Sequence, residues 1–260
     1  MLRPRIIPCL LVKDKGLVKT VKFDKPKYVG DPINAVRIFN EKEVDELMVV
    51  DIDATWHNAS PDFKMIENLA AECRMPLCYG GGIKTIEQAQ KIIGLGVEKV
   101  AISSAAVANP ELVSHIAKRI GSQSVAVVVD AKRKLIGGNY EVCTHNGKKK
   151  TGKCPITFAK QVEEVGAGEI ILNCIDNDGI MKGYDFTLVD KLRGAINVPL
   201  TVLGGAGSLQ DIGSLIKKYG TIGAAAGSLF VFKGAYRAVL INYPNRSEKK
   251  ALMEKNYCLS

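Results

Sequence analysis

The amino-acid sequence predicts an α/β protein of the (β/α)8 class, a TIM barrel with a two-fold half-barrel repeat. Two observations favour this fold. Short apolar runs alternate with segments of helical periodicity along the chain, and the second half of the chain resembles the first. Nearly continuous apolar strands separated by helices are typical of a parallel sheet covered by helices. A doubly wound open sheet is the alternative, but eight strands in two matching halves close best as a barrel.

Eight apolar runs, most of them rich in β-branched residues, are expected to form the barrel strands. Helical periodicity between them is clearest in PINAVRIFNEKEV (32–44) and TIEQAQKIIGLG (85–96). The strands are predicted at residues 5–12, 46–53, 76–80, 98–103, 124–131, 168–175, 198–203 and 221–227.

The internal repeat joins two pairs of segments. DPINAVRIFNEKEVDELMVVDIDAT (31–55) parallels CPITFAKQVEEVGAGEIILNCIDND (154–178), and YGGGIKTIEQAQKIIGLGVEKVAISSAA (79–106) parallels LGGAGSLQDIGSLIKKYGTIGAAAGSLF (203–230). Duplication of a half-barrel explains both matches. The prediction is therefore one barrel domain over 1–260, with half-barrels at about 1–123 and 124–240 and a C-terminal helix or tail at 241–260 that has no assigned role.

The composition is that of an ordinary globular protein, with 47% hydrophobic and 24% charged residues. No apolar stretch approaches the roughly 18 residues that cross a bilayer, and the N-terminal apolar run is too short for a signal peptide. We therefore expect a cytoplasmic protein without a membrane partner. The seven cysteines contain no C-x-x-C pair, so reduced apolar thiols are favoured over disulfides or a metal site.

The net charge of +9 indicates an anionic partner. Nucleic acid, an acidic protein and an anionic small molecule are the three classes to weigh. Many of the basic residues fall in two lysine-rich loops, 13–27 and 145–153, and no aromatic stacking motif or recognition helix accompanies them. A phosphorylated small molecule is therefore favoured, and no nucleic acid is expected.

Glycine and serine gather where the predicted strands end, which is where barrel enzymes place their active sites. Backbone N–H groups of such turns can approach a phosphate closely, and a following helix N-terminus adds its dipole. Plain turn glycines are the alternative, but matched turns in the two halves predict two anion sites and a doubly phosphorylated ligand. The candidates are Gly81, Gly82, Ser103, Ser104, Gly204, Gly205, Gly227 and Ser228.

Asp130 closes the apolar run SVAVVVD at the same end of the barrel. A carboxylate there could act as a general acid or base. The alternative is a carboxylate that forms a salt bridge with Lys132 or with loop lysines.

The motifs RIIPCL, GDP (30–32), ELMVVDID, YGGGI, KVAISSAAV, VVDAKR, TGKCP, GAGEIIL, DNDGIMKGYD and LGGAGS together closely resemble the cyclase subunit of imidazole glycerol phosphate synthase. The similarity covers about residues 3–235. It implies a lyase- or synthase-type barrel in a glutamine amidotransferase complex, without a metal or cofactor. A glutaminase subunit would dock at the N-terminal face of the barrel and send ammonia through the interior to a bis-phosphorylated ribulosyl-formimino substrate at the top.

The resemblance also implies an ammonia gate of four charged residues at the bottom of the barrel. They carry over to Arg5, Glu46, Lys99 and Glu169, each at the start of a predicted strand. Charges that point into a low-dielectric interior must pair. Outward-facing surface charges are the alternative.

At the top of the barrel this chain departs from the family. Of the family's two catalytic aspartates, the one at the end of strand five is present as Asp130, but the one at the end of strand one falls on Leu11. A leucine cannot exchange a proton. The family's threonine and serine on strands six and seven fall on Asn173 and Leu203. The resemblance implies catalytic roles for Lys19 and Asp178, which match family positions, and a phosphate-binding role for Gly179 beside Asp178.

Four functions are weighed against this pattern. We favour a paralogue that serves amidotransfer in acetamidino sugar formation for lipopolysaccharide (O-antigen) biosynthesis, acting with a glutaminase and possibly a further amidotransferase, because Leu11 removes a carboxylate and Asp53 adds one beside Asp51. The alternative is a genuine histidine-biosynthesis cyclase that forms imidazole glycerol phosphate and aminoimidazole carboxamide ribotide. A third possibility is a scaffold that only activates its glutaminase, but such a scaffold would not need the phosphate turns. A fourth is a related phosphate-binding isomerase barrel, and the four gate charges argue against it.

Overall fold

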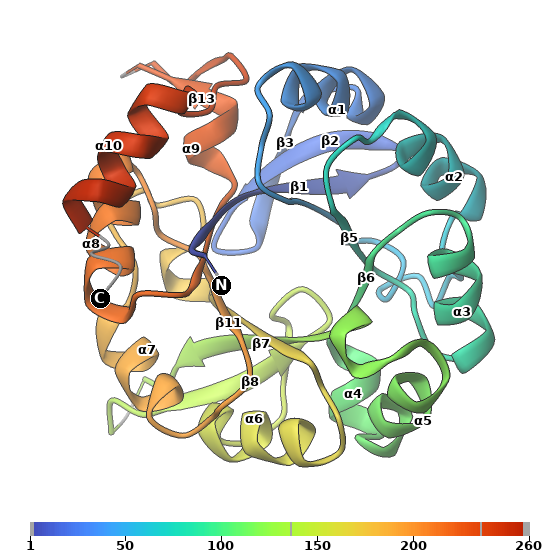
Figure 1. Ribbon diagram of the computed structural model, residues 1–260. Coiled ribbons are helices and arrows are strands. Elements are labelled where there is room, and N and C mark those ends of the chain that lie inside the picture. The colour runs from blue at the N-terminus through green and yellow to red at the C-terminus, as the bar shows by residue number, and fades with distance from the viewer. Residues whose placement is uncertain (1–2, 136, 235, 257–260) are drawn as a thin grey trace.

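Eight parallel strands close into a barrel at the centre of the molecule, and helices surround it (Figure 1). The computed structural model describes residues 3–135, 137–234 and 236–256. Each strand pairs with its neighbours in the order β1-β4-β5-β6-β7-β10-β11-β12, and β12 returns to β1. The predicted TIM barrel is therefore confirmed. Its strands are β1 (Arg5–Lys13), β4 (Leu47–Asp51), β5 (Leu77–Gly80), β6 (Lys99–Ile102), β7 (Val125–Arg133), β10 (Glu169–Cys174), β11 (Leu200–Leu203) and β12 (Gly223–Ala226).

The outer ring consists of α1 (Pro32–Glu41), α2 (Phe63–Glu72), α3 (Ile86–Gly94), α5 (Glu111–Ile120), α6 (Pro155–Glu164), α7 (Phe186–Arg193), α8 (Leu209–Tyr219) and α10 (Arg246–Asn256). Shorter turns of helix are α4 (Ser104–Ala108), α9 (Ser228–Val231), η1 (Ser122–Ser124) and η2 (Ile175–Asn177). Thr85 caps α3 and Ser208 caps α8, each in a capping box, so corresponding helices of the two halves start by the same device. Of the predicted C-terminal segment, 246–256 is helical, and 257–260 lie outside the described residues.

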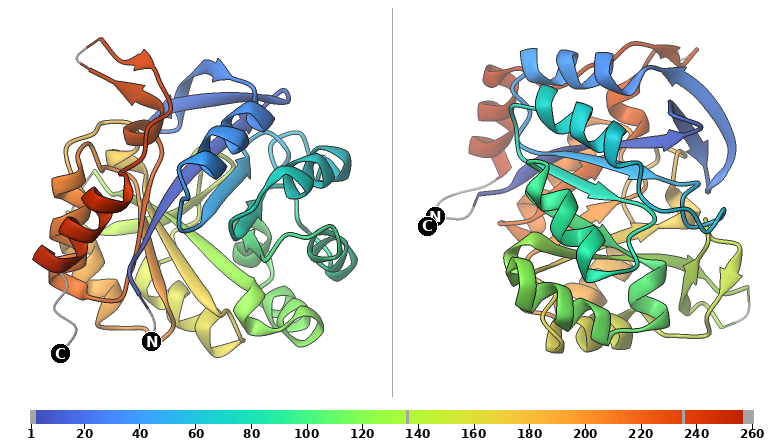
Figure 2. Two further views of the ribbon diagram at one scale, coloured as in Figure 1. Left: turned by 45° about the horizontal axis from the view of Figure 1, so that its top comes forward. Right: turned by 90° about the vertical axis from the view of Figure 1, so that its right-hand side faces the viewer.

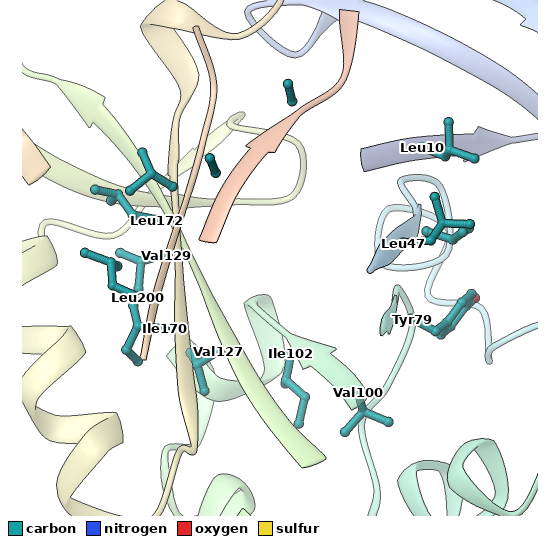
Figure 3. Close-up of a cluster of buried hydrophobic side chains, with 14 of the residues drawn as sticks. Leu10, Leu47, Tyr79, Val100, Ile102, Val127, Val129, Ile170, Leu172 and Leu200 are labelled. Atoms are coloured by element: carbon teal, nitrogen blue, oxygen red, sulfur yellow. The ribbon is translucent and has the colours of Figure 1, made fainter. Parts of the chain in front are cut away.

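Alternate residues of each barrel strand point outward and pack against the helices. Figure 3 shows this layer, with side chains such as Leu10, Tyr79 and Ile170 filling the space between barrel and helices. This layer contains the largest apolar side chains of the core, and many of them are fully buried. Because strand side chains alternate between faces, the remaining residues of the same strands must point into the barrel.

The barrel interior is built in layers from those inward-pointing residues. The strand register places Ile7 beside Ala225, Met48 beside both Cys9 and Cys78, and Ala101 beside Ala126. These residues form a separate apolar cluster with Ile171 and Leu203. Several of them are small, and charged residues lie at one end of the cluster and a cavity at the other.

Two segments expected as loops are β-hairpins instead. The first consists of β2 (Gly16–Val21) and β3 (Asp24–Gly30), and the second of β8 (Tyr140–Thr144) and β9 (Lys149–Lys150). Both extend barrel strands, since β2 pairs with β1 and β8 pairs with β7. In the right panel of Figure 2 the blue and the yellow-green hairpins project from the same end of the barrel. A third, short hairpin joins β13 (Phe232–Lys233) and β14 (Ala238–Val239).

Two further expectations concern the cysteines and the membrane. The six cysteines that the structure describes are all free thiols, four of them buried, and Cys258 lies outside the described residues. Within the described part of the chain, no helix is long and apolar enough to cross a membrane.

Candidate functional site

A cavity of about 450 Å³ lies at the C-terminal ends of the barrel strands. Four residues of the first predicted anion site line it: Gly81, Gly82, Ser103 and Ser104. Leu11 and Asp130 line it as well. His145 and Asn146, from the turn of the β8–β9 hairpin, also reach this cavity, and the sequence analysis did not single them out. We call it the larger cavity.

A smaller cavity of about 30 Å³ lies beside it, and the two share Cys9, Leu11, Phe23, Asn173 and Leu203 as lining residues. The smaller cavity collects the residues predicted from the second half of the chain, together with Lys19. They are Asp178, Gly179, Gly204, Gly205, Gly227 and Ser228. The fold thus separates the two groups of candidate phosphate-binding residues into adjoining cavities.

Glycine at most of these turns is required by the backbone itself. Gly81 has a φ of +121°, and an added Cβ would lie 2.5 Å from the carbonyl oxygen of Asp51. Gly205 has a φ of +123°, and its Cβ would lie 2.1 Å from the carbonyl oxygen of Gly183. A larger residue could not adopt either turn without strain. These two glycines are therefore explained by the turn geometry, whether or not a ligand binds there.

Asp130 lies at the end of β7 and accepts two hydrogen bonds, each of 3.1 Å, from Ser103 Oγ and Asn173 Nδ2. No ion pair among the described residues involves Asp130, so the salt bridge considered from the sequence is not formed. Burial raises the pKa of Asp130 to about 6, against the opposing effect of the Ser103 and Asn173 hydrogen bonds. A carboxyl group with such a pKa can exchange a proton near neutral pH.

Leu11 lies near the end of β1, paired with Val50 of β4, and lines both cavities. It packs with Val50, Val128 and Leu203 against the apolar cluster of the interior. The mouth of the barrel thus carries apolar side chains as well as the polar group of Ser103, Asp130 and Asn173. One oxygen, Asn173 Oδ1, is buried without a hydrogen-bond partner among the described residues.

Lys19 and Asp178 do not lie against Asp130. Lys19 belongs to β2, is only 5% exposed, and donates from Nζ to the carbonyl oxygen of Cys9 at 2.5 Å. Asp178 follows η2 and accepts from Thr20 Oγ1 at 2.9 Å and from the backbone N–H of Phe23 at 3.3 Å. Burial raises the pKa of Asp178 and lowers that of Lys19. Asp178 therefore holds the β2–β3 hairpin on the barrel.

The neighbouring acids at the end of β4 have separate partners. Asp51 lines the larger cavity and accepts from the backbone N–H groups of Asp53 and Ala54, at 2.9 and 3.0 Å. Burial raises the pKa of Asp51. Asp53 forms an ion pair with Lys13 at 3.2 Å and does not line either cavity. Of these two acids, Asp51 is the one placed to meet a ligand.

At the opposite end of the barrel, Arg5, Glu46, Lys99 and Glu169 form a closed ring, which we call the four-charge ring. Arg5 contacts Glu46 and lies 2.7 Å from Glu169, while Lys99 lies 2.7 Å from Glu46 and 2.8 Å from Glu169. Thr201 adds a hydrogen bond of 2.6 Å to Glu169.

Both glutamates of the ring are 5% exposed. Burial alone would raise the pKa of Glu169, but Arg5 and Lys99 hold it below its usual value. Arg5 and Leu11 lie about 20 Å apart along β1, since six steps of about 3.3 Å each join them. The ring therefore forms the floor of the interior whose top is the larger cavity.

Comparison with known proteins places this chain in a family. A family model described as "Histidine biosynthesis protein" matches residues 5–237. The chain is 58% identical to a provisionally named imidazole glycerol phosphate synthase subunit hisF3 of Vibrio vulnificus (strain YJ016), over 98% of each chain. It is 53% identical to a provisionally named subunit hisF2 of Pseudomonas aeruginosa, over 94% of this chain and 97% of the relative.

A more distant relative has the subunit name without a provisional qualifier. The imidazole glycerol phosphate synthase subunit HisF of Hyphomonas neptunium is 40% identical, over 89% of this chain and 91% of the relative. The barrel, the matched family model and these relatives agree. The chain belongs to the histidine biosynthesis protein family, as a cyclase-like HisF subunit of the imidazole glycerol phosphate synthase type.

Proposed function

We propose that this chain receives ammonia from a glutaminase subunit docked at the N-terminal face of the barrel, in a heterodimer, and delivers it to a doubly phosphorylated acceptor at the C-terminal mouth. The observation that carries this proposal is the four-charge ring at the floor of an otherwise apolar interior. Replacing a buried ion-pair network by apolar residues is often neutral or stabilising, so such a ring is weak evidence for a stabilising role. The position of the ring at the floor of the interior is explained if the ring acts as a gate through which ammonia passes.

The interior above the ring suits a small neutral molecule. Cys9, Cys78, Ala101, Ala126 and Ala225 line it with small, uncharged side chains. Moving an ammonium ion through such a lining would cost far more than moving neutral ammonia, because burying an unpaired charge is expensive. The first polar side chains beyond this lining are Ser103, Asp130 and Asn173, which face the larger cavity.

At the mouth, the two adjoining cavities supply candidate sites for two phosphoryl groups. We propose Gly81, Gly82, Ser103 and Ser104 for one, and Gly179, Gly204, Gly205, Gly227 and Ser228 for the other. Between them, Asp130 is the carboxyl group proposed to exchange a proton with the acceptor. Lys19 and Asp178 complete the proposed site at the smaller cavity.

We further propose that the acceptor is not the substrate of histidine biosynthesis. The support is Leu11, an apolar side chain at the position where the family resemblance leads us to expect a second catalytic carboxylate. Of the two carboxylates that the family's acid–base chemistry is expected to use, only Asp130 is then present. A role in acetamidino sugar formation for lipopolysaccharide (O-antigen) synthesis, with a further amidotransferase, fits such an altered centre.

A genuine histidine-pathway cyclase is the second candidate. It is supported by the 40% identity to the Hyphomonas neptunium subunit, which is named as a synthase subunit. Under this candidate Asp130 would suffice for the ring closure, or Asp51 at the same mouth would take the place of the missing acid. A histidine-pathway cyclase would turn over the bis-phosphorylated ribulosyl-formimino substrate, whereas a paralogue that serves sugar modification would not.

The partner is tested by co-expressing the chain with glutaminase-type subunits from its own genome. We expect a one-to-one complex in size-exclusion chromatography and a higher glutaminase rate in the complex than in the free glutaminase. Arg74→Glu, near the N-terminal ends of the strands, should weaken the complex more than Lys25→Glu on the β2–β3 hairpin. Failure to form a complex with every such subunit would contradict the proposal.

A further inference from the structure

The turn of the β8–β9 hairpin, residues 145–148, lies across the mouth of the barrel. The hairpin extends β7, which is three strands away from β4 in the ring of eight. The turn nevertheless reaches the loop after β4, where Asn146 Nδ2 donates to the carbonyl oxygen of Ile52 at 2.7 Å. It also meets the β2–β3 hairpin, because an added Cβ at Gly147 would lie 3.3 Å from Phe23 Cδ2. The turn therefore contacts loops on the far side of the mouth from the strand that carries it.

Lys148 makes a second contact with the loop after β4. Its Nζ atom lies over the ring of Trp56, 4.5 Å from the ring centroid, and Trp56 is 49% exposed. A cation over an exposed ring is stabilised only weakly, and so is a single hydrogen bond between neutral groups. We call these two contacts, Asn146 with Ile52 and Lys148 with Trp56, the latch. A latch of this strength can open and close while the barrel stays folded.

The backbone of the turn is strained. His145 and Asn146 have φ of +54° and +55°, and Gly147 follows at +71°. Asparagine and glycine tolerate this left-handed region, but a larger side chain such as that of His145 adopts it at a cost in free energy. Such a conformation persists where surrounding contacts hold it. The latch supplies contacts of this kind on the next residues of the turn.

His145 lies on the cavity side of the turn, since it lines the larger cavity. Its ring Nδ1 atom lies 3.0 Å from Thr144 Oγ1, and its backbone N–H donates to Ser104 Oγ at 3.4 Å. Among the described residues no hydrogen bond engages the other ring nitrogen, Nε2, which leaves that atom for a ligand. A ligand can favour a closed state only through contacts that it makes in that state. His145 can supply such a contact while the latch is closed.

We propose that residues 145–148 form a lid on the larger cavity, that Asn146 and Lys148 latch it to the loop after β4, and that His145 contacts the bound ligand from its inner side. The ligand enters when the latch opens and is enclosed when it closes again. The latch requires no particular ligand. Only the contact by His145 rests on the proposed function, because its test uses a doubly phosphorylated ligand.

The latch is tested on the whole chain without ligand, through the thiol of Cys9. Cys9 is 2% exposed and lines the larger cavity, so a thiol reagent reaches it from the mouth. Burial raises the pKa of this thiol to about 11, so it reacts slowly and its rate follows the fraction of open molecules. Labelling by methyl methanethiosulfonate is followed by peptide mass spectrometry. The exposed Cys154 is the reference in each sample, and Cys78, which is buried and lines neither cavity, reports loosening of the barrel itself.

Three variants are compared with the wild type. Asn146→Asp replaces the amide that donates to the Ile52 carbonyl oxygen by a carboxylate, and aspartate also tolerates the left-handed region. Lys148→Met removes the cation over Trp56. Lys149→Met makes the same change at the next lysine, which is exposed on β9, and is the control. Thermal unfolding reports whether each variant is folded.

We expect Cys9 to react about two- to tenfold faster in Asn146→Asp and about two- to fivefold faster in Lys148→Met, since each change removes one contact of the latch. Lys149→Met should react as the wild type does. Equal rates for Cys9 in all four proteins would overturn the latch. An equal rise in Lys149→Met, or a parallel rise at Cys78, would overturn it as well.

The contact by His145 is tested with the bis-phosphorylated ribulosyl-formimino compound, in the absence of ammonium salt so that no reaction follows. Trp56 is the only tryptophan of the chain, and its fluorescence in a stopped-flow instrument reports association and dissociation. His145→Asn removes the imidazole ring and keeps a residue that tolerates the left-handed region. We expect it to raise the dissociation rate about threefold or more and to leave the association rate unchanged. Lys148→Met should raise both rates by the same factor and leave the affinity unchanged, because the latch lies on the way in and out.

The results separate the two parts of the proposal. Equal dissociation rates for His145→Asn and the wild type would overturn the contact by His145. Unchanged association and dissociation rates in Lys148→Met would overturn the lid. A wild type that does not bind the compound would overturn the doubly phosphorylated acceptor together with the contact by His145, and the labelling of Cys9 would then decide the latch by itself.

Discussion

Asn173 donates from its side-chain amide to Asp130 at 3.1 Å, while its own Oδ1 atom is buried and has no hydrogen-bond partner in the part of the chain that the structure describes. The carboxylate fixes the orientation of the amide, because the opposite orientation would bring two acceptor oxygens together. An unsatisfied buried acceptor typically costs about 1–3 kcal/mol. A hydrogen-bond donor on a bound ligand would remove that cost, so we expect Asn173 to contact the ligand beside Asp130, the proposed acid–base group.

Asn173→Leu should therefore change the titration of Asp130. It deletes a hydrogen bond that favours the ionised carboxylate, so the pKa of Asp130 should rise above its value of about 6. Ser103→Ala should act in the same direction, because Ser103 donates to the same carboxylate. Titration of the carboxyl carbon by NMR measures the shift, and an unchanged or lower pKa in Asn173→Leu would refute the geometry.

Asp130 should also make stability depend on pH. Its pKa is raised from 3.8 in the unfolded chain to about 6 in the fold, so the fold takes up a proton that the unfolded chain has lost. The resulting stability is fully present below about pH 4 and is lost as the pH rises through about 6. Asp130→Asn should stabilise the protein at pH 7.5, by at most about 3 kcal/mol because the group is partly open to the cavity.

Urea denaturation of Asp130→Asn and wild type at pH 3.5 and pH 7.5 measures this effect. The gain should be present at the higher pH and absent at the lower. A variant that is less stable than the wild type at pH 7.5 would mean that the carboxylate is a stabilising group and is not held at a raised pKa.

Breaking the four-charge ring should be costly even though the ring itself adds little stability. Lys99→Met leaves Glu46 and Glu169 buried with only Arg5 to compensate them, and removal of one partner from such a network costs about 3 kcal/mol or more. The matched control is Lys64→Met, which breaks the exposed pair with Glu67 and should cost less than about 1 kcal/mol. Equal midpoints of urea unfolding for the two variants would contradict the buried ring.

Thr20→Val should loosen the β2–β3 hairpin. It removes the hydroxyl donor to Asp178, which is one of the contacts that hold the hairpin on the barrel. Hydrogen exchange should become faster for amides of 16–30 and stay unchanged in the barrel strands. Thr187→Val, at an exposed position of α7, is the control. Slow exchange in the hairpin of Thr20→Val would mean that Asp178 does not act as its anchor.

Much of the fold could be predicted because each barrel strand is a short apolar run. The predicted barrel strands match the observed ones to within two residues at every end, as at β1 and β10. The hairpins were missed because their lysines interrupt the alternation that marks a strand, and β3 is exposed along most of its length. The division into half-barrels at about 1–123 and 124–240 stays a prediction.

The site could be predicted only in part. Strand ends and glycine turns pointed to Asp130 and to part of the lining of both cavities, since position along a strand determines the face and the end of the barrel, but they did not point to His145 and Asn146. The contacts between side chains were not predictable. That Asp178 anchors a hairpin, that Lys19 lies over Gly227 and that Asn173 has a free acceptor all depend on packing between segments far apart in the chain.

Loss of the histidine-pathway reaction at Leu11 is the main change that we propose for this ammonia-using barrel. It is tested most directly by supplying the purified chain with the bis-phosphorylated ribulosyl-formimino substrate and ammonium salt, and by measuring imidazole glycerol phosphate. We expect no turnover by the wild type and measurable turnover by Leu11→Asp, since the added carboxylate would face the larger cavity together with Asp130. Turnover by the wild type at a rate that Leu11→Asp does not exceed would contradict the claim and support the histidine-pathway cyclase.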